Sequence, residues 1–483
     1  HQDLYSRYLF HAESWYTGDG APQWVIAAGH YPREFCGICD QWGQNIKQNA
    51  AVQEAMYDFW HNRVLTTPAG PVGVQDAFLN QLERTLRYLR EHLGAHEFAR
   101  ILGLDPLNEP YAGRYDRDQN GESWERDLLL PFHLKVRQRM DAAGWQDKPA
   151  YVEPNMFWDA NLGFMKEPGG FVDVGRLGPR LVFNTHFYDQ QALSGIFMWG
   201  KANDGQYTAD FGAIRQRAAD LGTAAIVSEF GSPVTGYTSD KTPTVLKGMY
   251  QALDSAARGR DWWRDAARSG PVLSAMQWQW DIYNGRHHEP MNGNPHKIQT
   301  AGDAWNSEDF SMVQLDDTGS PRLRVDPRLI DRIYPTAVAG HTLAFTYEDR
   351  ARDGTTLTWN QIPASLPNVA TLVGSGQYAV IIWRSGAGDA PTELHLPSTF
   401  TPANTTVISD LGTSTSAANE IRCPSAEQPI VLADQTLILS APGTAGAIHY
   451  ALVANGPQAP TAGLRAAARQ ELARWAADME FPG

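Results

Sequence analysis

Short apolar runs and longer amphipathic stretches alternate from Ile101 to about Trp280, and this alternation limits the fold more than any other feature. The runs that read as strands are ILGLDPLN, AYVEP, RLVFNTHFY, AAIVSEFG and VLSAMQWQW. Helices are predicted between them, for example in WERDLLLPFHLKVRQRMDAAG, and one more upstream in VQDAFLNQLERTLRYLREHLG. Strands that alternate with helices imply parallel βα units. Units of this size in series predict a (β/α)8 barrel.

The pattern changes after Pro327. Short alternating runs follow, separated by Gly, Pro, Asn and Asp, such as HTLAFTYED, YAVIIWR, TELHLP, TTVISD and AIHYALV. This pattern is typical of an antiparallel β-sandwich. The last stretch, GLRAAARQELARWAAD, predicts a helix. We therefore expect a barrel domain over residues 1–327, a sandwich over 328–457 and a helical tail over 458–483.

Two of the predicted parallel strands end on a glutamate. Glu109 ends the first strand and is followed by Pro110, which stops it. Glu229 ends the fourth and is followed by Phe230 and Gly231. In a (β/α)8 barrel the active-site residues project from these strand ends. A single such glutamate would most simply be a solvated strand-end residue. Two on different strands can face each other, as the paired carboxylates of glycoside hydrolysis do.

Several short motifs resemble those of a known family. LNEP and SEFG look like the acid/base and nucleophile motifs of glycoside hydrolase family 5. HQDLYSRY, TGDGAPQW, NTHFYD, AWNSEDFS and YPTAVAG resemble its endoglycoceramidase and glucosylceramidase/steryl-glucosidase branch. The resemblance spans about residues 1 to 455. It implies a retaining β-glycosidase, without metal or cofactor, that cleaves the β-glucosidic bond between a sugar and a lipid.

The resemblance also assigns roles to individual residues. Glu229 would be the nucleophile, and Glu109 the general acid and then the base. Glu109 must be protonated when substrate binds, so its surroundings must raise its pKa. Asn108, beside the acid, matches the residue that holds the sugar 2-hydroxyl group.

Further substrate-binding residues are expected at other strand ends. His186 and Tyr188 share one face of their strand because strands have a period of two. By resemblance, Tyr188 would contact the nucleophile and His186 the sugar, although both could simply be core residues. Trp280 ends the last strand and could be a stacking floor for the sugar. His1 and Asp3 match residues that bind sugar hydroxyls in the endoglycoceramidases.

Composition narrows the possible partners. The chain has 40 Lys and Arg against 54 Asp and Glu, a net charge of −14. This acidity argues against nucleic acid as a partner. No apolar run is long enough for a transmembrane helix, so we expect at most transient contact with lipid aggregates. Cys36 and Cys39 could form a small disulfide or remain idle thiols, and Cys423 is alone. A disulfide would favour secretion, but localisation stays open. We expect the full-length enzyme to be a monomer.

The lipid half of the substrate leaves fainter traces. Residues 196–199 form the apolar run IFMW in an expected surface loop, where they could contact a ceramide or sterol or pack under the loop. Two other functions remain open. One is an endo-β-1,4-glucanase-type polysaccharide hydrolase on the same barrel. The other is an inactive fragment that retains only glycan or lipid binding.

The start of the chain carries one more expectation. HQD resembles the stretch just after the third strand of the family's barrel, which would place three βα units upstream of His1. We therefore expect an open, five-stranded parallel sheet beside a complete sandwich. An isolated chain of this kind should be poorly soluble or inactive, because a barrel has no exposed edges only when it is closed.

Overall fold

The protein was analysed as a computed structural model. The structure describes residues 22–31, 46–47, 50–194, 201–234, 242–280, 282–283, 310–351, 361–388, 390–401, 403–411, 435–440, 444–456 and 460–481. The chain forms two compact units. Unit 1 holds His1–Ser194, Gln216–Gly236 and Ala275–Arg322, and unit 2 holds Gly195–Arg215, Tyr237–Ser274 and Leu323–Gly483. The expected domain boundaries at residues 327 and 457 stay predictions.

The centre of unit 1 is a sheet in the order β3-β4-β5-β6. Its strands are β3 (Ala150–Val152), β4 (Leu181–Tyr188), β5 (Ala225–Gly231) and β6 (Ser274–Gln277). The β3–β4 and β4–β5 pairs are parallel, as the sequence predicts. The four elements coincide with four of the five expected strands, so the α/β class is confirmed.

The fifth expected strand, over residues 101–108, is reduced to one parallel bridge between Leu104 and Ala150. The prediction of a strand there was too long. Pro106 has no N–H group to donate to a ladder, and Glu109 has a left-handed backbone with φ +45°, so the chain leaves the extended conformation. The backbone nevertheless follows the predicted path beside β3 and delivers Glu109 to the same end of the sheet.

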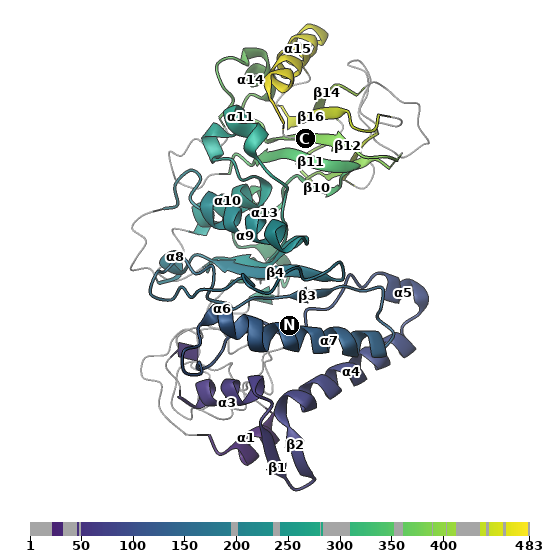
Figure 1. Ribbon diagram of the computed structural model, residues 1–483. Coiled ribbons are helices and arrows are strands. Elements are labelled where there is room, and N and C mark those ends of the chain that lie inside the picture. The colour runs from purple at the N-terminus through teal and green to yellow at the C-terminus, as the bar shows by residue number, and fades with distance from the viewer. Residues whose placement is uncertain are drawn as a thin grey trace. The chain divides into compact units, whose positions relative to one another are not determined.

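Helices cover this sheet in unit 1. α7 (Leu130–Ala142) packs against β3, and α4 (Val74–His92) packs against α7 (Figure 1). The apolar residues of α4 recur at spacings of three and four, and the buried ones include Phe78, Leu82 and Leu86. The sequence therefore buries one face of α4 and leaves its charged face in water.

The other elements of the first 323 residues are shorter or lie at the periphery. They are α1 (Gln23–Gly29), α3 (Ala50–Trp60), β1 (Val64–Thr67), β2 (Gly70–Gly73), α5 (Ala95–Ala99), α6 (Gly121–Trp124), a π-helical turn (Glu125–Leu129), α8 (Gln190–Ser194), α9 (Thr208–Leu221), α10 (Thr242–Asp254), a 3₁₀ turn (Gly259–Asp261), α11 (Trp262–Asp265), a 3₁₀ turn (Ala266–Arg268), β7 (Ile282–Tyr283), β8 (Val313–Leu315) and β9 (Pro321–Leu323).

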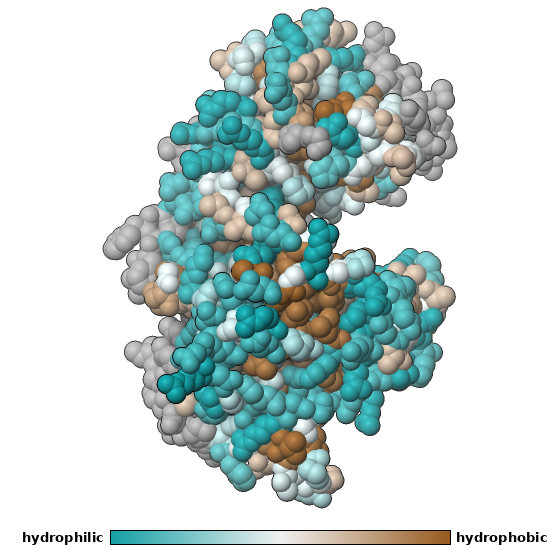
Figure 2. All heavy atoms as spheres, viewed as in Figure 1, coloured by the Kyte–Doolittle hydropathy of each residue, from teal (hydrophilic) through white to brown (hydrophobic). Residues whose placement is uncertain are grey.

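Both edges of the parallel sheet carry exposed apolar side chains. Leu102, just before the bridge at Leu104, is 73% exposed, and Met276 of β6 is 54% exposed. Hydrophobic residues are visible at the surface of this part of the molecule (Figure 2). Among the described residues the four strands do not close into a barrel. The expected (β/α)8 barrel therefore remains a prediction.

Unit 2 contains two antiparallel sheets. One has the order β11-β12-β16-β14, with β11 (Gly340–Glu348), β12 (Tyr378–Ser385), β16 (Ile448–Asn455) and β14 (Thr405–Ser409). The other has the order β10-β13-β15, with β10 (Tyr334–Ala337), β13 (Thr392–His395) and β15 (Thr436–Leu439). One hydrophobic cluster joins their inner faces, including Phe345 and Ile381 of the first sheet and Leu394 and Leu437 of the second.

Helices cover the outer face of the larger sheet. α14 (Pro367–Val373) and α15 (Ala462–Asp478) share a second apolar cluster with α11, β11, β12 and β16. The predicted C-terminal helix corresponds to α15, and a further short helix, α13, spans Pro327–Ile330. In the described part of the chain, no helix has both the length and the apolar character needed to cross a membrane.

Candidate active site

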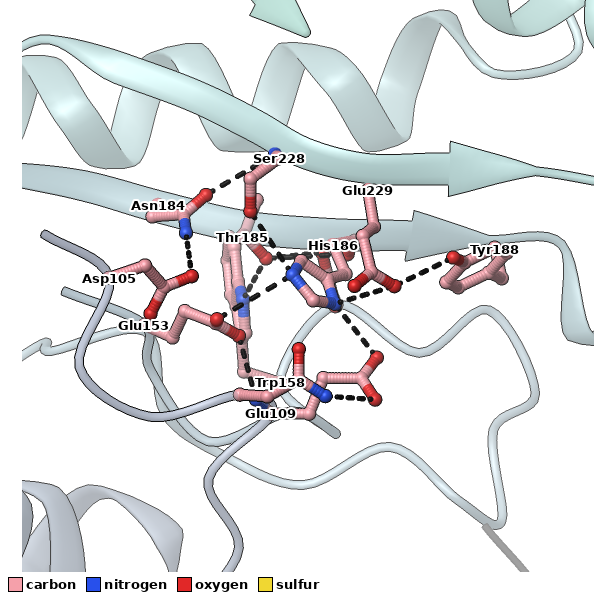
Figure 3. Close-up of polar contacts among 12 residues, drawn as sticks. Asp105, Glu109, Glu153, Trp158, Asn184, Thr185, His186, Tyr188, Ser228 and Glu229 are labelled. Carbon is pink, nitrogen blue, oxygen red and sulfur yellow. Dashed lines mark hydrogen bonds and ion pairs between the residues drawn. The ribbon is translucent and has the colours of Figure 1, made fainter. Parts of the chain in front are cut away.

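Two neighbouring parallel strands supply most of the site. His186 and Tyr188 project from the end of β4, and Ser228 and Glu229 from the end of β5 (Figure 3). The pairing of these strands is irregular, because Thr185 lies opposite Val227 while His186 lies opposite Glu229. Such bulges re-aim side chains next to active sites. Here the irregularity brings Ser228 and Glu229 to the same histidine.

A close backbone approach follows Glu229. A Cβ atom added at Gly231 would lie 2.4 Å from the carbonyl oxygen of Trp278. Only glycine fits there without moving the backbone, which gives a physical reason for the SEFG pattern. The N–H group of Trp278 also donates to the carbonyl of Phe230, at 2.8 Å, so this segment is fastened to the end of β5.

Glu109 reaches the site from the loop that follows the Leu104 bridge. Its backbone has φ +45°, a conformation that non-glycine residues seldom adopt and that costs on the order of 1–3 kcal/mol. The N–H group of Glu109 donates to Glu153 Oε2 at 3.0 Å. Glu153 follows the end of β3 and is 2% exposed. A buried carboxyl group thus holds the strained backbone that aims the Glu109 side chain.

The segment that carries Glu153 is itself held on both sides. His133 of α7, fully buried, contacts the carbonyl of Glu153 through Nε2 at 3.3 Å, and burial lowers its pKa to about 4. The neutral ring can therefore donate from Nε2 to that carbonyl. Two residues further on, the N–H group of Asn155 donates to Glu125 Oε1 at 2.8 Å. Burial raises the pKa of Glu125 to about 7, against three backbone hydrogen bonds that lower it.

His186 lies between the two predicted catalytic glutamates. Its Nδ1 is 2.9 Å from Glu109 Oε1 and 3.4 Å from Glu229 Oε2. Its Nε2 is 3.1 Å from Ser228 Oγ. One carboxyl oxygen of Glu109 and one of Glu229 lie within 4.8 Å of each other. The two carboxyl groups that the sequence singled out therefore share one partner, although they are 120 residues apart in the chain.

Burial and charge shape the protonation of this cluster. Burial raises the pKa of the Glu109 carboxyl group, and Glu229 adds to this shift while His186 opposes it. For His186, burial acts to lower the pKa, but the carboxyl groups of Glu153, Glu229 and Glu109 together raise it well above its usual range. An imidazolium ring donates from both nitrogens, which matches acceptors at Glu109 and Ser228.

The remaining predicted residues fare differently. Tyr188 donates its hydroxyl to Glu229 Oε2 at 2.8 Å, a bond that favours the ionised carboxylate. Asn108 lies beside the acid, with Nδ2 3.5 Å from Glu109 Oε2. Trp280 is 66% exposed, and its role as a stacking floor stays a prediction. His1 and Asp3 lie outside the described residues.

Sequence reasoning gave no role to Asp105 and Glu153. Asp105 accepts a hydrogen bond from Asn184 Nδ2 at 3.2 Å, and Asn184 Oδ1 accepts one from the N–H group of Ser228 at 3.2 Å. One signal was available. Glu153, like Glu109, ends an apolar run and is followed directly by proline.

Two sets of side chains in the described residues have the donor types of a metal site. They are Asp105 with Glu153 and His186, and Glu109 with His186 and Glu229. Both sets belong to the hydrogen-bonded cluster just described, and glycoside hydrolysis by paired carboxyl groups needs no cation. We therefore describe the cluster through its protons. Its chemistry is that of a buried acid next to a second carboxylate.

Comparison with solved structures points to one class of protein, because those with similar folds include several glycoside hydrolases. Sterylglucosidase 1 from Cryptococcus neoformans is 13% identical, with a TM-score of 0.58 over 95% of this chain and 81% of that one. This match shows a shared fold and agrees with the resemblance read from the sequence. Neither protein-family models nor curated proteins gave a match.

Two endoglucanases match much less well. An endo-β-1,4-glucanase from Xanthomonas axonopodis pv. citri is 13% identical, with a TM-score of 0.29 over 50% of this chain and 62% of its own. A GH5-4 broad specificity endoglucanase from Bacteroides salanitronis is 17% identical, with a TM-score of 0.29 over 42% of this chain and 54% of its own. Scores this low carry no argument about this chain.

Proposed function

We propose that this protein is a retaining β-glycosidase in which Glu229 is the nucleophile and Glu109 is the acid/base. The observation that carries the proposal is the cluster itself. Two buried carboxyl groups from separate strands of a parallel sheet converge on His186, and they differ in their surroundings. Paired carboxyl groups kept in different protonation states are the requirement for this reaction.

The surroundings suggest which carboxyl group does what. Burial raises the pKa of Glu109, so this group can stay protonated and deliver its proton to the leaving oxygen. Glu229 accepts the hydroxyl of Tyr188, which stabilises the ionised form that attacks the anomeric carbon. In the second step Glu109, now ionised, takes a proton from water as the water attacks the glycosyl-enzyme.

The distance between the carboxyl groups supports retention of configuration. In retaining enzymes the two groups stand about 5–5.5 Å apart, and in inverting enzymes about 6.5–9.5 Å, which leaves room for a water. The nearest oxygens of Glu109 and Glu229 are within 4.8 Å, with His186 bonded between them. So short a gap favours direct attack by Glu229.

We further propose a β-linked glycolipid, a glycosylceramide or a steryl glucoside, as the substrate. This rests on the branch that the sequence resembles, on the apolar run over residues 196–199, which lies outside the described residues, and on the likeness to a sterylglucosidase. The proposal includes a barrel around the parallel sheet, a sandwich made by the two antiparallel sheets, and Asn108, His186, Tyr188, Trp280, His1 and Asp3 as substrate-binding residues.

One experiment separates the candidate functions. The protein is incubated with glucosylceramide, a ganglioside, a steryl glucoside and a soluble β-glucan, and the released sugar is identified, with Glu229→Gln as the blank. We expect release from a lipid glycoside, with the β-anomer formed first. Release from the glucan alone would mean a polysaccharide hydrolase. Binding of glycolipid without release from any substrate would mean a non-catalytic binding protein.

A further inference from the structure

A second pair of acids lies directly beside the catalytic pair. Glu153 and Asp105 are both within reach of His186, and one oxygen of each lies within 4.8 Å of the other and of a ring nitrogen (Figure 3). Glu153 is 2% exposed. Two buried carboxylates this close would repel each other strongly. The proposed reaction uses neither of them, so their presence needs its own explanation.

One oxygen of each acid has no donor. Asp105 Oδ2 accepts from Asn184, and Glu153 Oε2 accepts from the N–H group of Glu109. In the described part of the chain, Asp105 Oδ1 and Glu153 Oε1 are buried with no hydrogen-bond partner. Buried oxygens of this kind are nearly always paired, so each such exception calls for a missing hydrogen.

His186 does not supply that hydrogen. Its Nε2 lies 3.1 Å from Ser228 Oγ and 3.5 Å from Glu153 Oε1, so the N–H group belongs to the serine. Its other nitrogen faces Glu109 and Glu229. A histidine with one positive charge also cannot balance four ionised carboxyl groups packed around it. A proton between Asp105 and Glu153 would meet both needs.

We propose that Asp105 and Glu153 share one proton, carried by Glu153, and that Glu153 thereby acts as a positioning residue for Glu109. The neutral Glu153 donates from Oε1 to Asp105 Oδ1 and accepts the Glu109 N–H group at Oε2. Its acceptor oxygen holds the left-handed backbone of Glu109 in place. The positive charge of His186 is then left to Glu109 and Glu229. The positioning role rests on the proposed function, whereas the shared proton does not.

The direction of the pKa shifts agrees with this assignment. Burial raises the pKa of Glu153 well above its usual range, and its hydrogen bond with Asp105 raises it further. Burial also raises the pKa of Asp105, but the same hydrogen bond lowers it. The bond therefore leaves Glu153 as the protonated member of the pair.

The test compares two substitutions at one position. Gln copies a protonated Glu, because its NH₂ group can donate to Asp105 and its oxygen can accept from Glu109. Glu153→Gln should keep kcat/KM within about tenfold, since at most one hydrogen bond changes in strength. Glu153→Ala removes the support of Glu109 and should lower kcat/KM on the order of 10²-fold, the loss that a small misplacement causes. Rescue by Gln but not by Ala is what a neutral Glu153 requires.

Infrared difference spectroscopy tests the proton itself, without any substrate. Near neutral pH the wild type minus Glu153→Gln spectrum should contain the C=O band of a protonated carboxyl group. Glu125, whose pKa burial raises to about 7, contributes equally to both proteins and cancels. Glu471→Gln is the matched control, because Glu471 is also buried at 4% exposure but accepts the N–H groups of Asn368 and Val369. That substitution should leave the band in place.

Three results would overturn the inference. The band could be absent from the difference spectrum, which would mean that both acids are ionised. Glu153→Gln could be as damaging as Glu153→Ala, which would mean that the charge of Glu153 is needed. Zn²⁺ or Mg²⁺ could raise the melting temperature of the wild type but not of Glu153→Gln, which would put a cation where we place the proton. Because the band needs no turnover, an inactive protein would contradict the proposed function and leave this test intact.

Discussion

The histidine between the two glutamates gives the sharpest prediction about pH. In His186→Asn the amide can still donate toward Glu109, but the positive charge is lost. With their oxygens within 4.8 Å, two carboxylates repel by about 3 kcal/mol at an effective dielectric constant of about 20. At 2.9 and 3.4 Å the imidazolium attracts each carboxylate by about 5 kcal/mol on the same scale. The substitution therefore leaves the repulsion without compensation.

The sign of the effect follows from the role of Glu109. Without the cation, the carboxyl pair binds protons more readily, so Glu109 stays protonated to higher pH than in the wild type. The acid must be protonated to work, and its loss of the proton sets the alkaline limb of the kcat/KM profile. That limb should move to higher pH. Loss of a charged hydrogen bond should also lower the maximum roughly 10- to 100-fold.

The assay is the pH dependence of kcat/KM on a small water-soluble aryl β-glucoside, with His92→Asn as the control. His92 lies in the last turn of α4, and the same chemical change there should leave both limbs in place. An alkaline limb that stays put, or moves to lower pH, in His186→Asn would refute the argument that His186 acts through its charge.

Three further outcomes are expected. Glu229→Gln should abolish turnover, and substantial residual hydrolysis measured by sugar release would rule out Glu229 as the nucleophile. Phe197→Ser combined with Trp199→Ser should weaken cleavage of a lipid glycoside far more than cleavage of the aryl glucoside, because only the lipid can use remote binding energy; equal losses would mean that the loop only supports the fold. Gly231→Ala forces a Cβ atom to within 2.4 Å of the Trp278 carbonyl and should cost about 1–3 kcal/mol in urea unfolding, as overpacking does; an unchanged midpoint would contradict this.

The geometry of parallel strands made part of the site predictable. Glu109, His186, Tyr188 and Glu229 were chosen because each stands at the carboxyl end of an apolar run, and such ends meet at one edge of a sheet. The structure brings these four together. The period of two placed His186 and Tyr188 on one face, and both now contact a predicted catalytic glutamate.

Local backbone detail was less predictable. The helix expected over residues 124–144 is broken into α6, a π-helical turn over Glu125–Leu129, and α7. Pro131 cannot donate to the carbonyl four residues earlier, and a wider turn before it is one way to accommodate the ring. The sequence contained the proline, but whether a helix bends, widens or ends there depends on what packs around it. Here Glu125 faces inward and binds the backbone of Asn155 and Gly170.

The contact between Asp105 and Glu153 could not be read from the sequence at all. The two lie 48 residues apart, and neither spacing nor periodicity says that two buried acids should meet. Their pairing follows from two facts of the folded chain. The Leu104 segment lies directly beside β3, and Glu109 turns back in a left-handed conformation whose N–H group needs an acceptor. Once that acceptor is a buried glutamate next to a second acid, a proton has to accompany it. The polar groups that support a catalytic pair are thus set by the backbone conformation of the catalytic residue, which becomes visible only in the fold.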